Sequence, residues 1–239
     1  MMNVKLINEF FIQKYGNEIT EYEDAFAYKD DENFLHIAIS DGSTEASFSK
    51  EWAQILVNHY VKSPTTLINM KWLRPAIKEL YNIIKIDSLP WYAKNKFIEQ
   101  GSYATLIGLS FNKQENQLSI VAVGDSCALF EYVTDKLLIP FDDETKFSNN
   151  PYLISSLENR NELLINNQFT AKLEIDEELD IFCMSDALGS WYYSSLGCLG
   201  ELEFLESNND FIDFVSDNRK NNTLKNDDVT LIHIKVSFP

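Results

Sequence analysis

The sequence predicts an α+β layered domain built on antiparallel sheets, and not a doubly wound parallel one. Two observations favour this class. Apolar runs of strand length follow one another along the chain and are joined by short polar turns, which is typical of hairpins. Segments with helical spacing come in pairs between groups of strands, whereas a parallel sheet needs a helix after nearly every strand.

In the first half of the chain the spacing predicts a hairpin followed by two helices. The change from strand to helix comes after Asp41-Gly42, and Ser47 or Ser49 is the expected cap of the first helix. The expected elements are strands 25–28 and 34–40 around a polar turn at 29–33, a helix containing Phe48, Trp52, Ile55, Leu56 and Tyr60, and a helix over about 67–84.

In the second half strands return, and residues 141–168 are irregular and rich in Asn and Asp. A hairpin turn is expected at 134–136, and another at 176–178. The expected elements are strands 103–111, 118–123, 127–133 and 137–139, a hairpin of strands 169–175 and 179–184, helices 186–193 and 211–219, and a closing strand 229–236.

The 239 residues contain no Pro/Gly/Ser-rich linker and no internal repeat, so we expect one domain spanning 1–239. The opening residues show no apolar signal-peptide core and no small-residue cleavage site. Cys127, Cys183 and Cys198 form no CxxC pair and lie in apolar surroundings, which favours reduced thiols and a cytoplasmic location.

The chain is strongly acidic, with 20 Lys and Arg against 37 Asp and Glu and a formal charge of −17. Nucleic acids and anionic membrane surfaces are disfavoured as partners, because both are polyanions that bind through basic residues. No stretch approaches the roughly 20 apolar residues of a membrane span. Acidity fits a protein that holds hard cations on carboxylates, and it also fits simple solubility.

Several chemistries are excluded by spacing. No cysteine is followed by Arg six residues later, and neither a GxxxxGK[ST] loop nor a GxSxG elbow occurs. His36, His59 and His233 have no Cys or His neighbour at ligand spacing, so zinc is not expected.

Acidic residues at the ends of predicted strands remain. Asp41, Asp125 and Asp186 each follow an apolar strand, Asp227 precedes the last strand, and Glu23-Asp24 opens the first hairpin. Each alone is explained by turn or cap chemistry. If the strand ends cluster, the carboxylates raise one another's pKa and favour Mg²⁺ or Mn²⁺, which prefer oxygen ligands. Two such ions can activate a shared water and hold a phosphoryl group.

Read in order, six segments resemble the metal-dependent protein phosphatases, the type 2C serine/threonine family. They cover residues 23 to 234, and the SDALGSW form is similar to a divergent bacterial branch of that family, which implies bacterial signalling. The segments are EDAF (23–26), AISDG (38–42), GSYATL (101–106), VAVGDS (121–126), CMSDALGSW (183–191) and NDDVTLIHI (226–234).

The resemblance implies a four-layer α-β-β-α sandwich, with two antiparallel sheets flanked by antiparallel helix pairs and a site for two Mg²⁺ or Mn²⁺ ions. By this likeness Asp41 bridges both ions, the Gly42 carbonyl binds the first, and Asp186 and Asp227 bind the second. Glu23 and Asp24 hold metal-bound waters, and Asp125 belongs to a weaker third site. In this likeness Asp41, Asp186 and Asp227 act through a bridging water that attacks a phosphoserine or phosphothreonine of a protein phosphorylated by a cognate kinase.

The sequence departs from the family pattern at three places. Ile19 stands where an Arg often grips the substrate phosphate, Ser43-Thr44-Glu45 replaces a glycine-containing stretch, and Ser190 replaces an Asp of the third metal site. These departures leave a second hypothesis open, namely a pseudophosphatase that keeps the fold and acts as a binding or regulatory module. Residues 141–168 occupy the place of the family's flap, and their sequence does not decide whether they form one.

Overall fold

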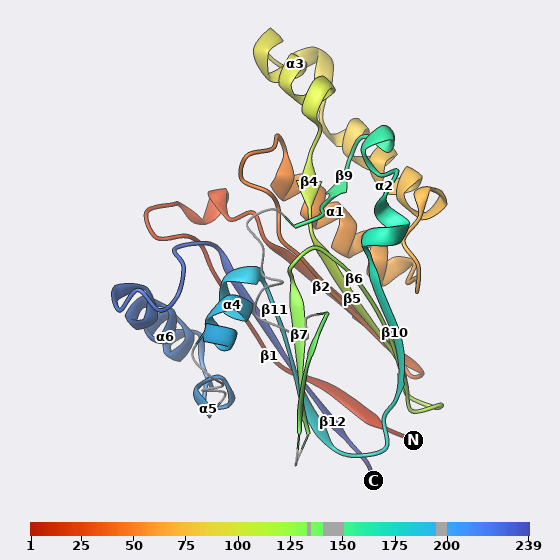
Figure 1. Cartoon of the computed structure of the whole chain (residues 1–239), viewed down its shortest axis with the longest axis vertical. Coiled ribbons are helices and arrows are strands. Elements are labelled where there is room, and N and C mark those ends of the chain that lie inside the picture. The colour runs from red at the N-terminus through yellow and green to blue at the C-terminus, as the bar shows by residue number, and fades with distance from the viewer. Residues whose placement is uncertain (133–134, 141–150, 195–199) are drawn as a thin grey trace.

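The computed structural model of the protein describes residues 1–132, 135–140, 151–194 and 200–239 (Figure 1). Its strands are β1 (Asn3–Ile12), β2 (Ala25–Asp30), β3 (Phe34–Ser40), β4 (Tyr103–Ala104), β5 (Leu106–Asn112), β6 (Gln117–Val123), β7 (Cys127–Tyr132), β8 (Lys136–Ile139), β9 (Ile154–Ser155), β10 (Phe169–Glu174), β11 (Leu179–Met184) and β12 (Val229–Ser237). Its α-helices are α1 (Ser49–Lys62), α2 (Met70–Ile83), α3 (Trp91–Gln100), α4 (Asp186–Ser194), α5 (Gly200–Glu203) and α6 (Asn208–Lys220).

Two five-stranded antiparallel sheets form the centre of the molecule. One has the order β1-β12-β11-β7-β8 and the other β10-β6-β5-β3-β2, while β4 and β9 form a short separate pair. The α+β class with antiparallel sheets, predicted from the sequence, is confirmed. In β1 and β12 the two ends of the chain lie side by side, with Asn3 opposite Ser237 (Figure 1).

The main core lies between the two sheets. Alternate side chains of β3 and β5, such as Ile37, Ile39 and Leu109, are fully buried against side chains of the other sheet, such as Phe130 and Ile181. The period of two along each strand puts these residues on one face, so that removing apolar area from water holds the sheets together.

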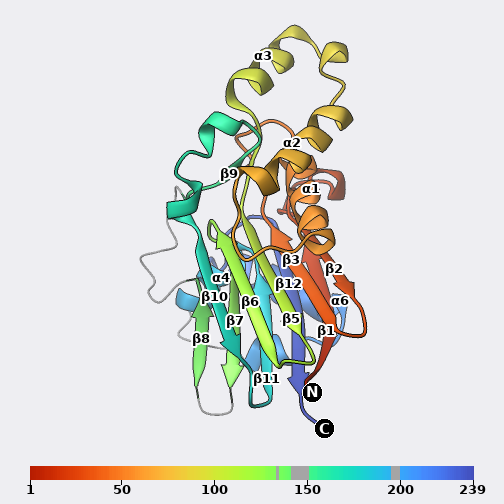
Figure 2. The same ribbon diagram turned by 90° about the vertical axis from the view of Figure 1, so that its right-hand side faces the viewer.

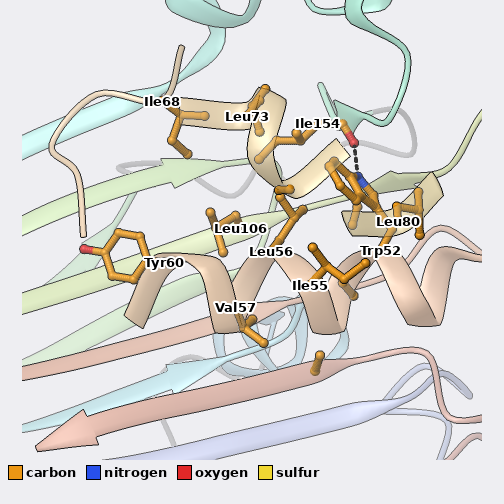
Figure 3. Close-up of a cluster of buried hydrophobic side chains, with 14 of the residues drawn as sticks. Trp52, Ile55, Leu56, Val57, Tyr60, Ile68, Leu73, Leu80, Leu106 and Ile154 are labelled. Atoms are coloured by element: carbon orange, nitrogen blue, oxygen red, sulfur yellow. Dashed lines mark hydrogen bonds between the residues drawn. The ribbon is translucent and has the colours of Figure 1, made fainter. Parts of the chain in front are cut away.

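A second core lies between β-strands of the β10-β6-β5-β3-β2 sheet and helices α1 and α2 (Figure 3). Trp52 and Leu56 of α1 pack there with Leu73 of α2, and the indole Nε1 of Trp52 donates a 2.9 Å hydrogen bond to the carbonyl of Ile154. Gly108 of β5 is required at this contact, because a Cβ there would clash with the ring of Tyr60. The helices thus pack closely beside the loop that follows β3.

A third core covers the outer face of the other sheet, where Phe182 and Leu231 pack against Trp191 of α4 and Phe211 and Val215 of α6. Figure 1 shows α4 and α6 on the opposite side of the sheets from α1 and α2, and in Figure 2, where α1 and α2 face the viewer, α4 and α6 lie behind the sheets. Among the described helices, none combines the length and the apolar character that crossing a bilayer requires.

Two sequence predictions, one about strand pairing and one about a helix cap, are wrong, and two elements were not predicted. Strands β10 and β11 do not form a hairpin, because β10 pairs with β6 in one sheet and β11 with β7 and β12 in the other. Neither Ser47 nor Ser49 caps α1, whose N-cap is Phe48 in a left-handed conformation, and Ser49 Oγ instead donates to the carbonyl of Ser43. Strand β1 and helix α3 were not predicted.

The single strand predicted at 103–111 is divided at Thr105 into β4 and β5, which belong to different sheets. The remaining strand and helix predictions agree with the structure to within a few residues at their ends. The β7–β8 hairpin is confirmed, although positions 133–134 of its turn lie outside the described residues. Of the irregular segment 141–168, residues 141–150 also lie outside them.

Candidate functional site

A cleft of about 480 Å³ opens where several strands of the two sheets end. Four aspartates reach it from four parts of the chain: Asp41 follows β3, Asp125 follows β6, Asp186 begins α4, and Asp227 precedes β12. The other residues that line it are Gly42, Ser43, Thr44, Glu45, Thr105, Pro151, Leu153 and Lys225.

The loop after β3 is held by its backbone. Asp41 donates its N–H to Thr105 Oγ1 at 2.8 Å, and its carbonyl accepts the N–H of Thr105 at 2.8 Å. Gly42 forms a bridge with Ala104, and a Cβ on Gly42 would lie 2.8 Å from the carbonyl oxygen of Ser49. Glycine is therefore required at position 42, because the start of α1 approaches the loop closely.

Thr105 also connects this loop to the one that carries Asp125. Its Oγ1 lies 2.6 Å from the hydroxyl of Ser126. Between these loops Gly124 has φ +92°, and its backbone packs against the Thr105 side chain. The turn conformation places Asp125 at the cleft wall, where 7% of the residue is exposed.

Asp186 and Asp227 come from the opposite sheet. Asp186 lies in the first turn of α4, where the helix dipole favours a negative charge, and its Oδ2 lies 3.7 Å from Nζ of Lys225. Asp227 Oδ1 accepts the N–H of Asp228 at 3.1 Å and lies 3.9 Å from Nζ of Lys14.

Glu23 and Asp24 are not part of the cleft wall. Asp24 is buried, and its Oδ2 accepts a 2.6 Å hydrogen bond from Thr230 Oγ1, which also bonds to the hydroxyl of Tyr22. Its other oxygen, Oδ1, is buried and has no hydrogen-bond partner among the described residues. Glu23 is tied down by its N–H, which donates to Asp228 Oδ2 at 2.6 Å.

Several carboxyl groups at this end of the sheets have raised pKa values. Burial, together with repulsion from neighbouring carboxylates, raises the pKa of Asp41 well above its usual value and raises that of Asp186. The same causes raise the pKa of Asp24 and of Asp125 to about 7, and burial raises the pKa of Glu23. At neutral pH the group can be fully ionised only if a cation offsets the repulsion.

The donor set fits hard divalent cations. It consists of carboxylate and backbone oxygens without sulfur or imidazole, and the orphaned Oδ1 of Asp24 is a buried oxygen that still needs a positively charged or hydrogen-bonding partner. The geometry is not preformed, because no group of three or more His, Cys, Asp or Glu in the described part of the chain is arranged to hold an ion.

The three departures from the family pattern lie at different places. Ile19 begins the short 3₁₀ turn Ile19–Glu21, is 51% exposed and does not line the cleft. Ser43 and Glu45 do line it, whereas Ser190 lies within α4, outside the cleft lining. Of the segment 141–168, Pro151 and Leu153 contribute to the wall.

Three residues that shape the site, namely Thr105, Lys225 and Asp228, had no role assigned from the sequence. Asp228 accepts the N–H groups of Lys14 and Glu23, at 2.7 and 2.6 Å, and so joins two chain segments distant in sequence. Lys225 stands two residues before Asp227, so a basic residue beside a candidate ligand was a signal available in the sequence. The contacts of Thr105 and Asp228 are non-local and left no such signal.

No protein-family model and no curated protein sequence matches the chain. Solved structures do. A bacterial serine phosphatase matches with 15% identity and a TM-score of 0.63, over 100% of this chain and 99% of the other. Stp1, a serine/threonine phosphatase from Staphylococcus aureus, matches with 16% identity and a TM-score of 0.58, over 100% and 96%.

The catalytic domain of the serine/threonine phosphatase PstP, solved with two manganese ions, matches with 13% identity and a TM-score of 0.61 over 100% of both chains. At such identities the likeness shows the fold. The chain has the fold of bacterial type 2C serine/threonine phosphatases, and the resemblance seen in the sequence motifs is confirmed at that level.

Proposed function

We propose that the protein is a Mg²⁺- or Mn²⁺-dependent phosphoprotein phosphatase that hydrolyses phosphoserine or phosphothreonine monoesters. The observation that carries the proposal is the convergence of Asp41, Asp125, Asp186 and Asp227 on one cleft, at the motif positions of a phosphatase fold. A cluster of mutually repelling carboxylates costs stability, so its presence in a cleft is better explained by a ligand than by structure.

Two ions would be held by Asp41, the carbonyl of Gly42, Asp186 and Asp227, and a weaker third would involve Asp125. Glu23 and the orphaned oxygen of Asp24 would hold water molecules bound to these ions. When bound, such ions supply charge neutralisation at a phosphoryl group and activation of water. The chain itself positions Asp41, because Thr105 fixes the backbone of that residue on both sides.

We assign to Lys225 the role of binding the substrate phosphate, which an Arg often fills in the family. Its side chain is the one Lys or Arg on the cleft wall among the described residues, and 54% of it is exposed. Its 3.7 Å contact with Asp186 is loose, and a cation that takes over the Asp186 charge would leave Nζ available to a phosphate oxygen.

The test is hydrolysis of p-nitrophenyl phosphate and of a phosphothreonine peptide across a Mn²⁺ titration, with EDTA as the reference. We expect turnover of both substrates that rises with Mn²⁺ and is lost in EDTA. Turnover that is indifferent to both would reject a metal-dependent mechanism.

A pseudophosphatase is the second candidate, and Glu45 favours it. This carboxylate lines the cleft and adds negative charge where a phosphate dianion would approach. In that case Mn²⁺ binds, as calorimetry would show, but no phosphopeptide is hydrolysed. Glu45→Gln separates the two candidates further, because relief of repulsion raises turnover only in an enzyme that already has some.

The finer features of the family complete the proposal. The helices outside each sheet would make the four-layer α-β-β-α arrangement, with 1–239 as a single domain. The phosphoprotein substrate would be the product of a serine/threonine kinase in a bacterial signalling system.

A further inference from the structure

The charge of the protein is unevenly distributed. Residues 49–100, which contain α1, α2 and α3, carry eight Lys and Arg against four Asp and Glu, a formal +4. The rest of the chain carries twelve Lys and Arg against thirty-three Asp and Glu, a formal charge of −21. A local positive surface on a protein of the opposite sign requires a separate explanation, since solubility is already provided by the acidic remainder.

Helix α2 presents much of this charge as a stripe. Lys71, Arg74 and Lys78 recur at intervals of three and four residues, so they share one face of the helix, and Lys85 follows just beyond its C-terminal end. All four are exposed, whereas Leu73 and others on the opposite face are buried against α1 and the sheet.

Most of these cations are unpaired. Arg74 forms an ion pair with Glu158 at 3.3 Å, but Lys71, Lys78 and Lys85 have no carboxylate within ion-pair distance among the described residues, and the same holds for Lys96 of α3. Elsewhere in the chain lysines are commonly paired, as in Lys113 with Asp30 and Lys220 with Asp217.

Helix α3, which carries Lys96, adds exposed aromatic groups. Trp91 is 76% exposed and Tyr92 63%, and their rings contact each other edge to face with centroids 6.2 Å apart. The helix buries only Phe97, between Phe48 and Tyr81, and Figure 1 shows it extending beyond the ends of the sheets. Exposed Trp and Tyr are enriched at protein-binding surfaces.

This surface is connected to the cleft. From α3 the chain runs through Gly101 and Ser102 into β4, where Ala104 bridges Gly42 and Thr105 holds Asp41. Ser102 Oγ in turn donates to the carbonyl of Ser47, in the loop that leads from the cleft to α1. A protein bound on α2 and α3 would therefore lie at the same end of the sheets as the candidate active site.

We propose that Lys71, Lys78, Lys85, Lys96, Trp91 and Tyr92, here called the basic face, dock an acidic segment of the phosphoprotein substrate. This inference rests on the proposed function. A short acidic segment can be confined to this face, whereas nucleic acid or a bilayer would extend over the acidic remainder of the protein and be repelled. The phosphorylated residue would then be hydrolysed in the cleft while the flanking acidic residues contact the basic face.

The test compares two triple variants with the same change in charge. Lys71→Gln/Lys78→Gln/Lys96→Gln alters the basic face, and Lys5→Gln/Lys29→Gln/Lys172→Gln alters exposed lysines elsewhere. Their substrates are a phosphothreonine peptide with a flanking run of Glu and Asp, the same peptide with Gln and Asn in that run, and p-nitrophenyl phosphate.

For the acidic peptide we expect kcat/KM of the basic-face variant to fall about tenfold because KM rises, since three exposed ion pairs with the peptide are lost. The fall should be smaller at high salt, which screens such pairs. The other two substrates and the control variant should be unaffected. An equal loss on p-nitrophenyl phosphate, or no loss on the acidic peptide, would overturn the proposal.

A binding measurement separates this proposal from the proposed function. Fluorescence anisotropy of the labelled, unphosphorylated acidic peptide should show binding that only the basic-face variant loses, whether or not the protein turns over any phosphate. Absence of binding to the native protein would overturn the docking surface even if the enzyme is active. Tighter binding of a single-stranded oligonucleotide or of phosphatidylserine vesicles, lost in the same variant, would overturn it in favour of another polyanion.

Discussion

Nζ of Lys225 lies 3.7 Å from Oδ2 of Asp186, so the protein's own cation contacts a carboxylate that we assign to metal. Lys225→Met should raise KM for p-nitrophenyl phosphate and weaken inhibition by inorganic phosphate about fivefold, because an exposed charge-assisted contact contributes about 1 kcal/mol. The apparent affinity for Mn²⁺, measured by calorimetry, should stay the same or increase, since Asp186 loses a competing cation. Lys172→Met on β10 is the matched control, and unchanged phosphate inhibition in Lys225→Met would contradict the assignment.

The stability of the metal-free protein should depend on pH through its buried carboxyls. The pKa of Asp125 is about 7 in the folded state against an ordinary value of 3.8. Between these values the folded chain holds a proton that the unfolded chain has released, so this contribution to stability is present at low pH and is lost as pH rises through about 7.

Asp125→Asn removes that titration. In EDTA the variant should therefore be more stable than the native protein at pH 7.5 and lose most of this advantage at pH 4.5. The change is on the order of 3 kcal/mol, since one pKa unit corresponds to about 1.4 kcal/mol. Thermal denaturation at the two pH values measures it. The idea fails if the difference between variant and native protein does not change with pH.

The turn before Asp125 should tolerate only glycine. Gly124 has φ +92°, and a Cβ there would lie 2.6 Å from Cγ2 of Thr105, the residue that holds Asp41. Gly124→Ala should cost about 1–3 kcal/mol of stability and weaken Mn²⁺ binding as well. Gly16→Ala is the control, because Gly16 has φ +97° but nothing within 4 Å of the added Cβ. Equal costs for the two variants in urea denaturation would show that the contact with Thr105 is unimportant.

Asp228 should act in structure and not in metal binding. Its two oxygens accept the N–H groups of Lys14 and Glu23. Asp228→Ala leaves both donors without this partner and should cost about 2–3 kcal/mol, whereas Asp228→Asn keeps one acceptor and should cost less. Urea denaturation gives the two costs, and the reverse order would contradict the role given to these hydrogen bonds.

The sequence pattern predicted elements well where neighbours in sequence decide them. The apolar run in residues 34–40 corresponds to β3, which is buried on both faces, and the helical spacing from Trp52 to Tyr60 corresponds to α1, which buries one face. Pairing could not be predicted as well. The pattern of β10 and β11 indicated two strands but not their partners, and the short connection between them crosses from one sheet to the other.

Elements held by distant contacts were missed. Strand β1 pairs with β12 at the other end of the chain, and α3 buries a single side chain, Phe97, so neither has a local pattern strong enough to reveal it. In the site, the motif positions of Asp41, Asp125, Asp186 and Asp227 were visible in the sequence, and the structure brings them to one cleft. The hydrogen bonds of Thr105, which position the loops between them, became visible only in the fold.

We propose above that the clustered aspartates make a metal-dependent phosphatase. The decisive measurement is the rate at which a phosphothreonine peptide is hydrolysed in Mn²⁺ by the native protein, by Asp186→Asn and by Asp176→Asn. Asp176 is an exposed carboxylate outside the cleft lining and serves as the matched control. We expect Mn²⁺-dependent turnover that falls at least about 100-fold in Asp186→Asn, as loss of a group that stabilises the transition state implies, and that is unchanged in Asp176→Asn. Turnover in Mn²⁺ that Asp186→Asn leaves at the native level would contradict it.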